Sequence, residues 1–142
     1  MKKAVLFLFI ILGLSCSNKD KEKSNSTKNS TYKQSEMAAL MLEMYALNLE
    51  NKALILEGKK PKEFPSEFLK IHSATLTDPS DRNAAFEGFS EIYIKSYEEM
   101  LLSSTDSMKG MHNKTINSCI ACHKTTCIGP IPKIKKLLIS TN

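Results

Sequence analysis

The sequence predicts an all-α fold, an antiparallel four-helix bundle in which one helix is short. Two stretches, residues 35–58 and 82–102, repeat apolar residues at spacings of three and four, and a third such pattern starts near residue 106. No stretch alternates apolar and polar residues as a strand would, and there is no internal repeat. Short connections between successive helices favour antiparallel neighbours.

The first helix is predicted for residues 35–58. Ser35 can cap its start, and Gly58 followed by Pro61 marks its end. Neighbouring prolines limit the second helix to a short piece around residues 66–73.

The second long helix is predicted for residues 82–102. The last helix should start near Asp106 and end before Gly129 and Pro130, because a Gly-Pro pair cannot continue a helix. After this break, the segment 131–137 is expected to pack its apolar residues over the end of the bundle. The last helix is the one that carries the cysteine-rich stretch SCIACHKTTC.

Residues 1–15 are predicted to be a signal peptide and not part of the fold. Lys2 and Lys3 precede an unbroken apolar run, which suits a secretory signal and is too short to span a bilayer. The run leads to Cys16 in LGLSC, which resembles the lipobox of bacterial lipoproteins. In that family the cysteine is acylated and becomes the mature N-terminus, so the resemblance implies a lipid anchor at Cys16. The alternative is an ordinary signal peptide in which Cys16 has no role.

Residues 16–34 are rich in Lys, Ser, Asn and Thr and contain almost nothing apolar, which predicts a disordered tether. The folded domain is then residues 35–142. The formal net charge is +5, and removal of Lys2 and Lys3 with the signal peptide leaves +3. This charge is far below that of a nucleic-acid-binding domain, so nucleic acid is not an expected partner.

Cys119-Ile120-Ala121-Cys122-His123 follows the pattern C-x-x-C-H, which is typical of covalent attachment of a c-type haem. On a helix, Cys119 and Cys122 share one face and are spaced for two thioether bonds to the porphyrin. His123 can then turn its imidazole to the iron as the proximal ligand. Cys119, Cys122 and Cys127 are too few and too close together for a disulfide framework. The sequence therefore predicts one covalent haem c.

Two haem-free uses of these cysteines are the alternatives to haem attachment. A thioredoxin-like dithiol requires a βαβ pattern, which the sequence lacks. A zinc site made of Cys119, Cys122, His123 and Cys127 has suitable donors, but ligands so close together on a helix converge poorly on a tetrahedron. Outside such a site, Cys127 is expected to be a buried, inert thiol.

A C-x-x-C-H motif on the last helix of a small helical bundle resembles cytochrome c-prime and its six-coordinate relatives. The stretches AALMLEMY, FPSEFLKIHSATLTDPSDRNAAF and SCIACHKTTCIGPIPKIKKL resemble monohaem cytochrome c lipoproteins of Bacteroidetes. The resemblance covers most of residues 35–138, although only the haem motif is sharply specific. The chain departs from cytochrome c-prime after the motif, where the Arg of CxxCHxxFR is missing and Cys127 and Gly-Pro-Ile-Pro are added. The resemblance implies a haem-bearing last helix, redox protein partners and a homodimer formed through the first two helices.

The distal iron ligand is predicted to come from the first helix. Met37, Met41 and Met44 form one stripe of that helix, and a methionine there can reach across to an iron held by the last helix. Met41 is the favoured ligand, followed by Met44 and Met37, while ordinary core packing is the alternative. His72 on the short helix is a further candidate ligand.

The predicted function is that of a membrane-tethered, one-electron carrier in the periplasm or at the cell surface. It is not predicted to be an enzyme, because no nucleophile, general base or oxyanion-type constellation is evident. Lys133, Lys135 and Lys136 can attract acidic redox partners. The alternative function is that of a five-coordinate haem protein that binds NO or another diatomic gas on an open, apolar distal face.

Overall fold

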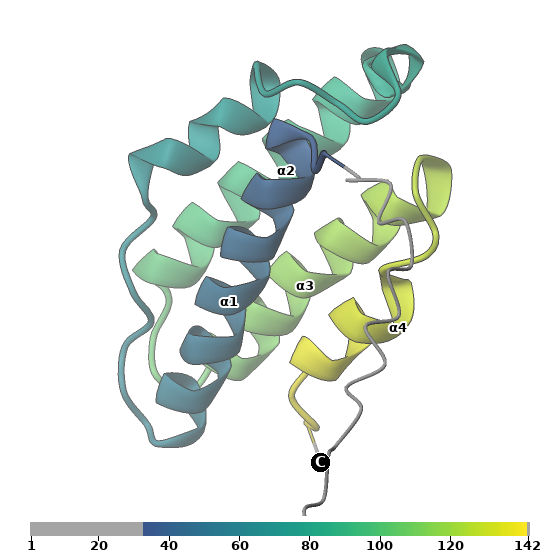
Figure 1. Cartoon of the computed structure of the whole chain (residues 1–142). Coiled ribbons are helices and arrows are strands. Elements are labelled where there is room, and N and C mark those ends of the chain that lie inside the picture. Colours follow the sequence, from purple (N-terminus) through teal and green to yellow (C-terminus); the bar gives the residue numbers. More distant parts are fainter. Residues whose placement is uncertain (1–32, 142) are drawn as a thin grey trace, which may run out of the picture. The chain divides into compact units, whose positions relative to one another are not determined.

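The computed structural model describes residues 33–141, and within this range the secondary structure is helical, with no strand (Figure 1). The all-α prediction is therefore confirmed. No helix in the described range is both long and apolar enough to cross a membrane. The predicted signal peptide, Cys16 and all but the last two residues of the predicted tether lie outside the described residues. The helices are α1 (Glu36–Leu56), η1 (Ser66–His72), η2 (Pro79–Asp81), α2 (Ala84–Leu102), α3 (Met108–Thr125), α4 (Ile131–Ile134) and η3 (Lys135–Leu137).

The two ends of α1 are fixed by local signals that the sequence shows. The Ser35 hydroxyl accepts a hydrogen bond of 3.1 Å from the backbone N–H three residues later, as an N-cap does. Gly58 has a φ of +73°, which favours glycine. The N–H of Gly58 donates to the Ile55 carbonyl and that of Lys59 donates to the Leu54 carbonyl. This pair of bonds closes the helix where the sequence predicted its end.

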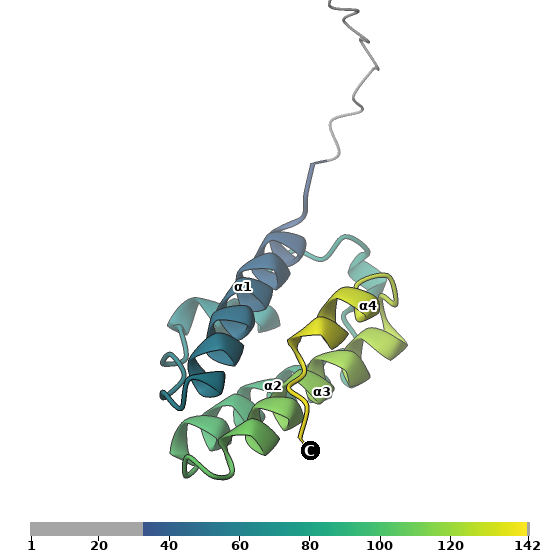
Figure 2. The ribbon, with the colours of Figure 1, turned by 90° about the horizontal axis from the view of Figure 1, so that it is seen from below.

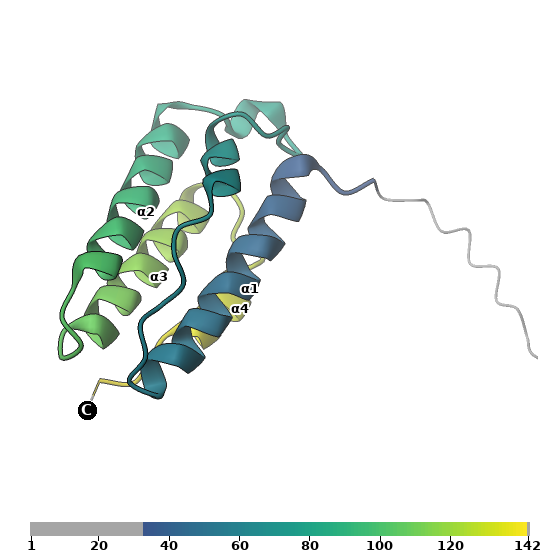
Figure 3. The same ribbon diagram turned by 90° about the vertical axis from the view of Figure 1, so that its left-hand side faces the viewer.

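Helices α1 and α2 run in the same direction, and α3 runs against both (Figures 1 and 3). Two buried hydrogen bonds fix the register between α1 and α2, from Asn48 to the Tyr93 hydroxyl at 3.2 Å and from Asn51 to the Tyr97 hydroxyl at 2.7 Å. The return between the two helices is made by an extended segment and by η1. The expected short helix is thus present as a 3-10 helix over Ser66–His72.

The chain after α3 folds back along α3 instead of covering the end of the bundle as predicted (Figure 2). Ile134 of α4 and Leu137 of η3 are buried in a small cluster with Ile116 and Ile120 of α3. We refer to residues 128–141 as the C-terminal tail. The tail lies along α3 because its apolar residues Ile134 and Leu137 pack against the apolar residues Ile116 and Ile120 of α3.

Side chains of α1 and α3 hold the backbone of the tail. The Lys52 ammonium group donates to the carbonyls of Lys136 and Leu138, both at 2.8 Å. Nε2 of the fully buried His112 lies 3.0 Å from the Leu137 carbonyl and therefore donates to it. These hydrogen bonds give partners to tail carbonyls that no long helix supplies with backbone N–H donors.

Replacing Asn113 by alanine should loosen the tail. The Asn113 amide donates to the Ile139 carbonyl at 2.7 Å, and its oxygen accepts from the Ile139 N–H at 2.8 Å. Each bond contributes about 1 kcal/mol, so the free energy of unfolding should fall by about 2 kcal/mol. Urea unfolding followed by circular dichroism measures the loss. Asn117→Ala, an exposed site on the same helix, should change stability by less than about 0.5 kcal/mol. Equal losses in both variants would contradict the anchoring role.

The stability of the fold should fall in mildly acidic solution because of His112. Burial lowers the pKa of His112 below its usual 6.5, and its Nδ1 has no hydrogen-bond partner. The folded protein keeps this imidazole neutral while the unfolded chain takes up a proton, so stability is lost as the pH falls below about 6.5, by at most about 1.4 kcal/mol per pH unit. Unfolding free energies measured between about pH 8 and pH 5 test this. His112→Gln should flatten that part of the pH profile, and an unchanged slope would assign it to another group.

Candidate functional site

The three motif residues lie in the last two turns of α3 and face one cavity. Cys119 and Cys122 are one helical turn apart, and His123 follows directly. All three side chains are half-buried. The Cys119 thiol donates to the carbonyl of Thr115 at 3.5 Å, within the helix. A regular α-helix therefore gives the two sulfurs a common orientation.

The two thiols are not activated. Burial raises the pKa of Cys119 to about 12 and also raises the pKa of Cys122 above its usual 9.0. Both are neutral thiols at physiological pH, whereas a reactive dithiol acts through a thiolate. In the part of the chain that the structure describes, no three His, Cys, Asp or Glu side chains are arranged to hold a metal ion. The raised pKa values do not favour a reactive dithiol, and the arrangement of the described side chains does not assemble a zinc site.

The His123 ring is held in one tautomer. Its Nδ1 lies 2.8 Å from the Cys127 carbonyl oxygen, and a carbonyl can only accept, so Nδ1 carries the proton. Nε2 then keeps its lone pair and is available to a metal. Histidines that bind metals commonly donate their other N–H to a carbonyl in this way. The turn that presents the carbonyl is tied to the end of α3, since the hydroxyls of Thr125 and Thr126 both donate to the Cys122 carbonyl.

The cavity has a volume of about 360 Å³, within the size range of small-molecule and cofactor sites. Its walls come mainly from α1, the end of α3 and the tail, and residues between Leu76 and Phe86 complete the lining. Most of the lining is apolar, as a porphyrin requires. The α1 wall and the tail wall are formed mainly by Met37, Met41, Met44, Tyr45, Asn48, Lys133, Ile134 and Leu137.

The methionine stripe predicted from the sequence lines this cavity together with the C-x-x-C-H motif. Met37 and Met44 are buried, and Met41 is half-buried. All three side chains line the cavity that Cys119 and His123 also line. The structure thus brings together residues that are more than 70 positions apart in the sequence, and it leaves each methionine as a candidate distal ligand.

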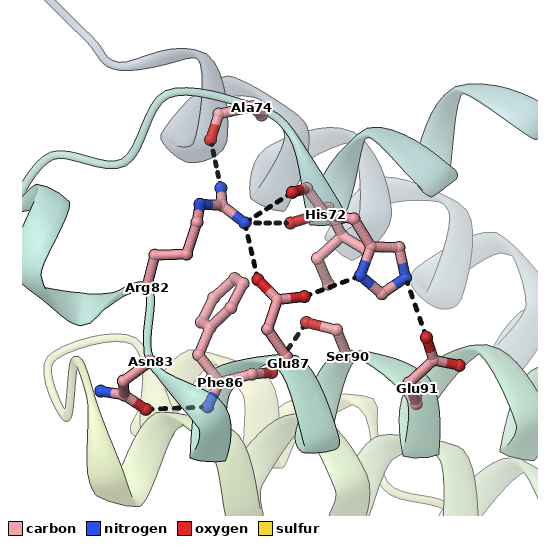
Figure 4. Close-up of polar contacts among 9 residues, drawn as sticks. His72, Ala74, Arg82, Asn83, Phe86, Glu87, Ser90 and Glu91 are labelled. Carbon is pink, nitrogen blue, oxygen red and sulfur yellow. Dashed lines mark hydrogen bonds and ion pairs between the residues drawn. The ribbon is translucent and has the colours of Figure 1, made fainter.

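The other candidate ligand, His72, is not among the residues that line the cavity. Its ring lies between two carboxylates of α2, with Nδ1 at 3.0 Å from Glu87 and Nε2 at 3.7 Å from Glu91 (Figure 4). Arg82 donates to Glu87 at 3.0 Å and to the Ala74 carbonyl at 2.6 Å. Hydrogen bonds from His72 and Arg82 lower the pKa of Glu87. His72 belongs to a polar cluster that joins η1 to α2.

The part of the tail that forms a cavity wall was not predicted. Lys133 places its Nζ 4.4 Å from the centre of the Tyr45 ring, which links the tail to α1 at the cavity. Ile134 and Leu137 complete this wall. The signal in the sequence was that Ile134 and Leu137 are three residues apart and are surrounded by lysines. This spacing indicates an apolar face, but it does not indicate which surface that face covers.

The expectation that Cys127 is buried is wrong. Helix α3 ends at Thr125, and the chain turns outward, which leaves Cys127 exposed beside the cavity. What this residue supplies to the site in the structure is its backbone carbonyl, which holds His123.

Comparisons of the chain with protein-family models, with curated proteins and with solved structures found no match.

Proposed function

We propose that this protein is a monohaem c-type cytochrome that carries one electron at a time and is tethered to a membrane through a lipid on Cys16. A single observation carries the proposal. The two motif cysteines, a histidine whose Nε2 is free to bind a metal, and a stripe of methionines all face one largely apolar cavity.

The residues present fit a haem. Cys119 and Cys122 would hold it by thioether bonds, and His123 would be the proximal iron ligand. A methionine of α1, with Met41 first and Met44 next, would be the distal ligand. When bound, haem iron exchanges a single electron between its ferric and ferrous states. The protein's part is to bind and orient the group and to keep water from it with apolar walls.

As part of this proposal, we interpret the fold as a four-helix bundle in which η1 is the short second helix and α3 is the helix that bears the haem. The support for this interpretation is that α1 and α3 line the same cavity, with the methionines on α1 and the motif on α3. Methionine ligation favours the ferrous state and raises the reduction potential, which suits electron transfer better than substrate chemistry. No enzymatic activity is part of the proposal.

The proposed partners are acidic redox proteins outside the cytoplasm, at the periplasmic or outer face of a membrane. Residues 107–141 contain six lysines and no Asp or Glu, and Lys133 lines the cavity. An excess of lysines over acidic residues in one part of a chain attracts acidic proteins and speeds their association. A lipid anchor would further raise the local concentration at membrane-bound partners.

The test is the absorption spectrum of the full-length protein purified from a host with working cytochrome maturation. The proposal expects a low-spin, six-coordinate haem with a sulfur-to-iron charge-transfer band in the oxidised form. A high-spin haem that takes up NO or CO without displacing a protein ligand would instead support a gas-binding protein. A colourless protein with the mass of the bare chain would overturn both.

A further inference from the structure

The cavity that holds the C-x-x-C-H motif is apolar except for a few positions. Within the described range, its lining includes only two residues of the types Asp, Glu, Lys and Arg, namely Asp81 and Lys133. Asp81 is the last residue of η2, and Lys133 belongs to α4. The two opposite charges therefore come from different parts of the chain.

Asp81 and Lys133 lie at different heights along α1. The segment that leads to Asp81 is joined to the start of α1, where the hydroxyls of Ser35 and Thr77 lie 2.9 Å apart. Lys133 instead places its Nζ 4.4 Å from the centre of the Tyr45 ring. Tyr45 follows Ser35 by ten residues, which is about 15 Å along a helix. The cavity thus has an acidic end near the start of α1 and a basic end beside α4.

The ammonium group of Lys133 has no carboxylate partner in residues 33–141. Lys62 and Lys114 each pair with a glutamate, and the ammonium group of Lys52 donates to two carbonyls of the tail. Lys133 contacts the face of the Tyr45 ring instead, and a cation–π contact of this kind leaves the positive charge in place. Lys133 is therefore available to an anionic group that enters the cavity.

Haem is apolar over most of its surface, but it carries two propionate carboxylates on one edge of the porphyrin. A carboxylate is stabilised next to an ammonium group and destabilised next to another carboxylate. We propose that Lys133 binds a propionate of the haem and so sets the propionate edge at the α4 end of the cavity, away from Asp81. This inference rests on the proposed function and adds a positioning residue that the C-x-x-C-H motif does not supply.

The other lysines of the tail do not share this position. Lys135 and Lys136 follow in the same segment but do not line the cavity, so they remain available to acidic redox partners. The tail is also where the sequence departs from cytochrome c-prime, so the contact with Lys133 is not implied by that resemblance.

The test is the reduction potential of the full-length holoprotein, measured by redox titration between about pH 5 and pH 9. A propionic acid that loses its proton near the iron gains a negative charge, which stabilises the ferric state and lowers the potential. Lys133 favours the ionised form, so the wild-type potential should be nearly constant above about pH 6. Lys133→Gln should lower the potential at pH 7, and it should move the pH-dependent step to higher pH by about one pH unit.

Two further variants separate a direct contact from a general effect of charge. Lys133→Arg keeps the positive charge and should retain the wild-type potential and pH profile. Lys135→Gln removes one lysine from the same tail outside the cavity and should leave the pH profile unchanged. The other titratable groups in or behind the lining are common to all variants and cancel in the comparison; they are Tyr45, Asp81, His112, His123 and Cys127.

Equal shifts in Lys133→Gln and Lys135→Gln would overturn the inference, because the loss of any tail charge would then explain them. A Lys133→Gln profile identical to that of the wild type would also overturn it, as would a Lys133→Arg variant that behaves like Lys133→Gln. Each of these results is obtained with haem present, so the proposed function would stand. A chain that carries no haem would overturn the proposed function, and this inference with it.

Discussion

Replacing both Cys119 and Cys122 by serine should abolish covalent haem attachment, while Cys127→Ser should retain it completely. The three cysteines lie within nine residues of each other and line one cavity. If haem attachment needed only a nearby thiol, replacing any one of the three would affect it. Only Cys119 and Cys122 are one helical turn apart on α3, as two thioether bonds to one porphyrin require. Cys127 lies beyond the end of the helix and is exposed.

The measurement is the mass of the denatured chain, because a covalent haem survives denaturation and a trapped one does not. The wild type and Cys127→Ser should each have the mass of the polypeptide plus one haem. The double variant should have the mass of the polypeptide alone. Circular dichroism of each variant shows whether the helices still form. A double variant that keeps the added mass, or a Cys127→Ser variant that loses it, would contradict the assigned attachment sites.

Local signals allowed most helix boundaries to be predicted from the sequence. A capping serine and a glycine in the left-handed region bound α1, and the prediction for this helix is confirmed to within two residues. The neighbouring prolines predicted a short helix around residues 66–73, and the structure has one over Ser66–His72, but its 3-10 geometry was not predicted. Such signals act within a few residues, so they do not reveal how distant segments pack.

The position of the tail along α3 was not predicted from these local signals. Its apolar residues were recognised, but their position along α3 depends on Lys52 and Asn113, which are 84 and 26 residues away from the carbonyls that they bind. The prediction that Cys127 is buried failed for a related reason, because its exposure depends on the direction in which the chain leaves α3. His72 also could not be placed from the sequence, because Glu87 and Glu91 on another helix determine which way its ring faces.

The C-x-x-C-H motif could be recognised in the sequence because its three residues lie within five positions of one helix, whereas the choice of a distal ligand depends on the packing of α1 against α3. The structure narrows the choice by removing His72 from the cavity lining but leaves three methionines there. These methionines follow the helical repeat, so each presents its sulfur to the cavity at a different height along α1. Replacing each methionine in turn tests which of them binds the proposed haem iron.

Met41→Leu should remove the sulfur ligand and convert the haem from low to high spin. Met41 is the least buried of the three methionines, so its side chain is the least committed to core packing. Leucine conserves volume and costs less than about 1.5 kcal/mol, so the fold should survive. The charge-transfer band should vanish, and the reduction potential should fall, within the roughly 0.8 V range that axial ligands span.

Met44→Leu and Met37→Leu are the matched tests, and Met100→Leu is the control, because Met100 is buried but does not line the cavity. If Met41 is the ligand, the other three variants keep the band and a potential close to that of the wild type. Loss of the band in Met44→Leu alone would transfer the role to Met44, one turn further along α1. If the band persists in all four variants, the ligand does not come from this stripe, and α1 serves only to enclose the cavity.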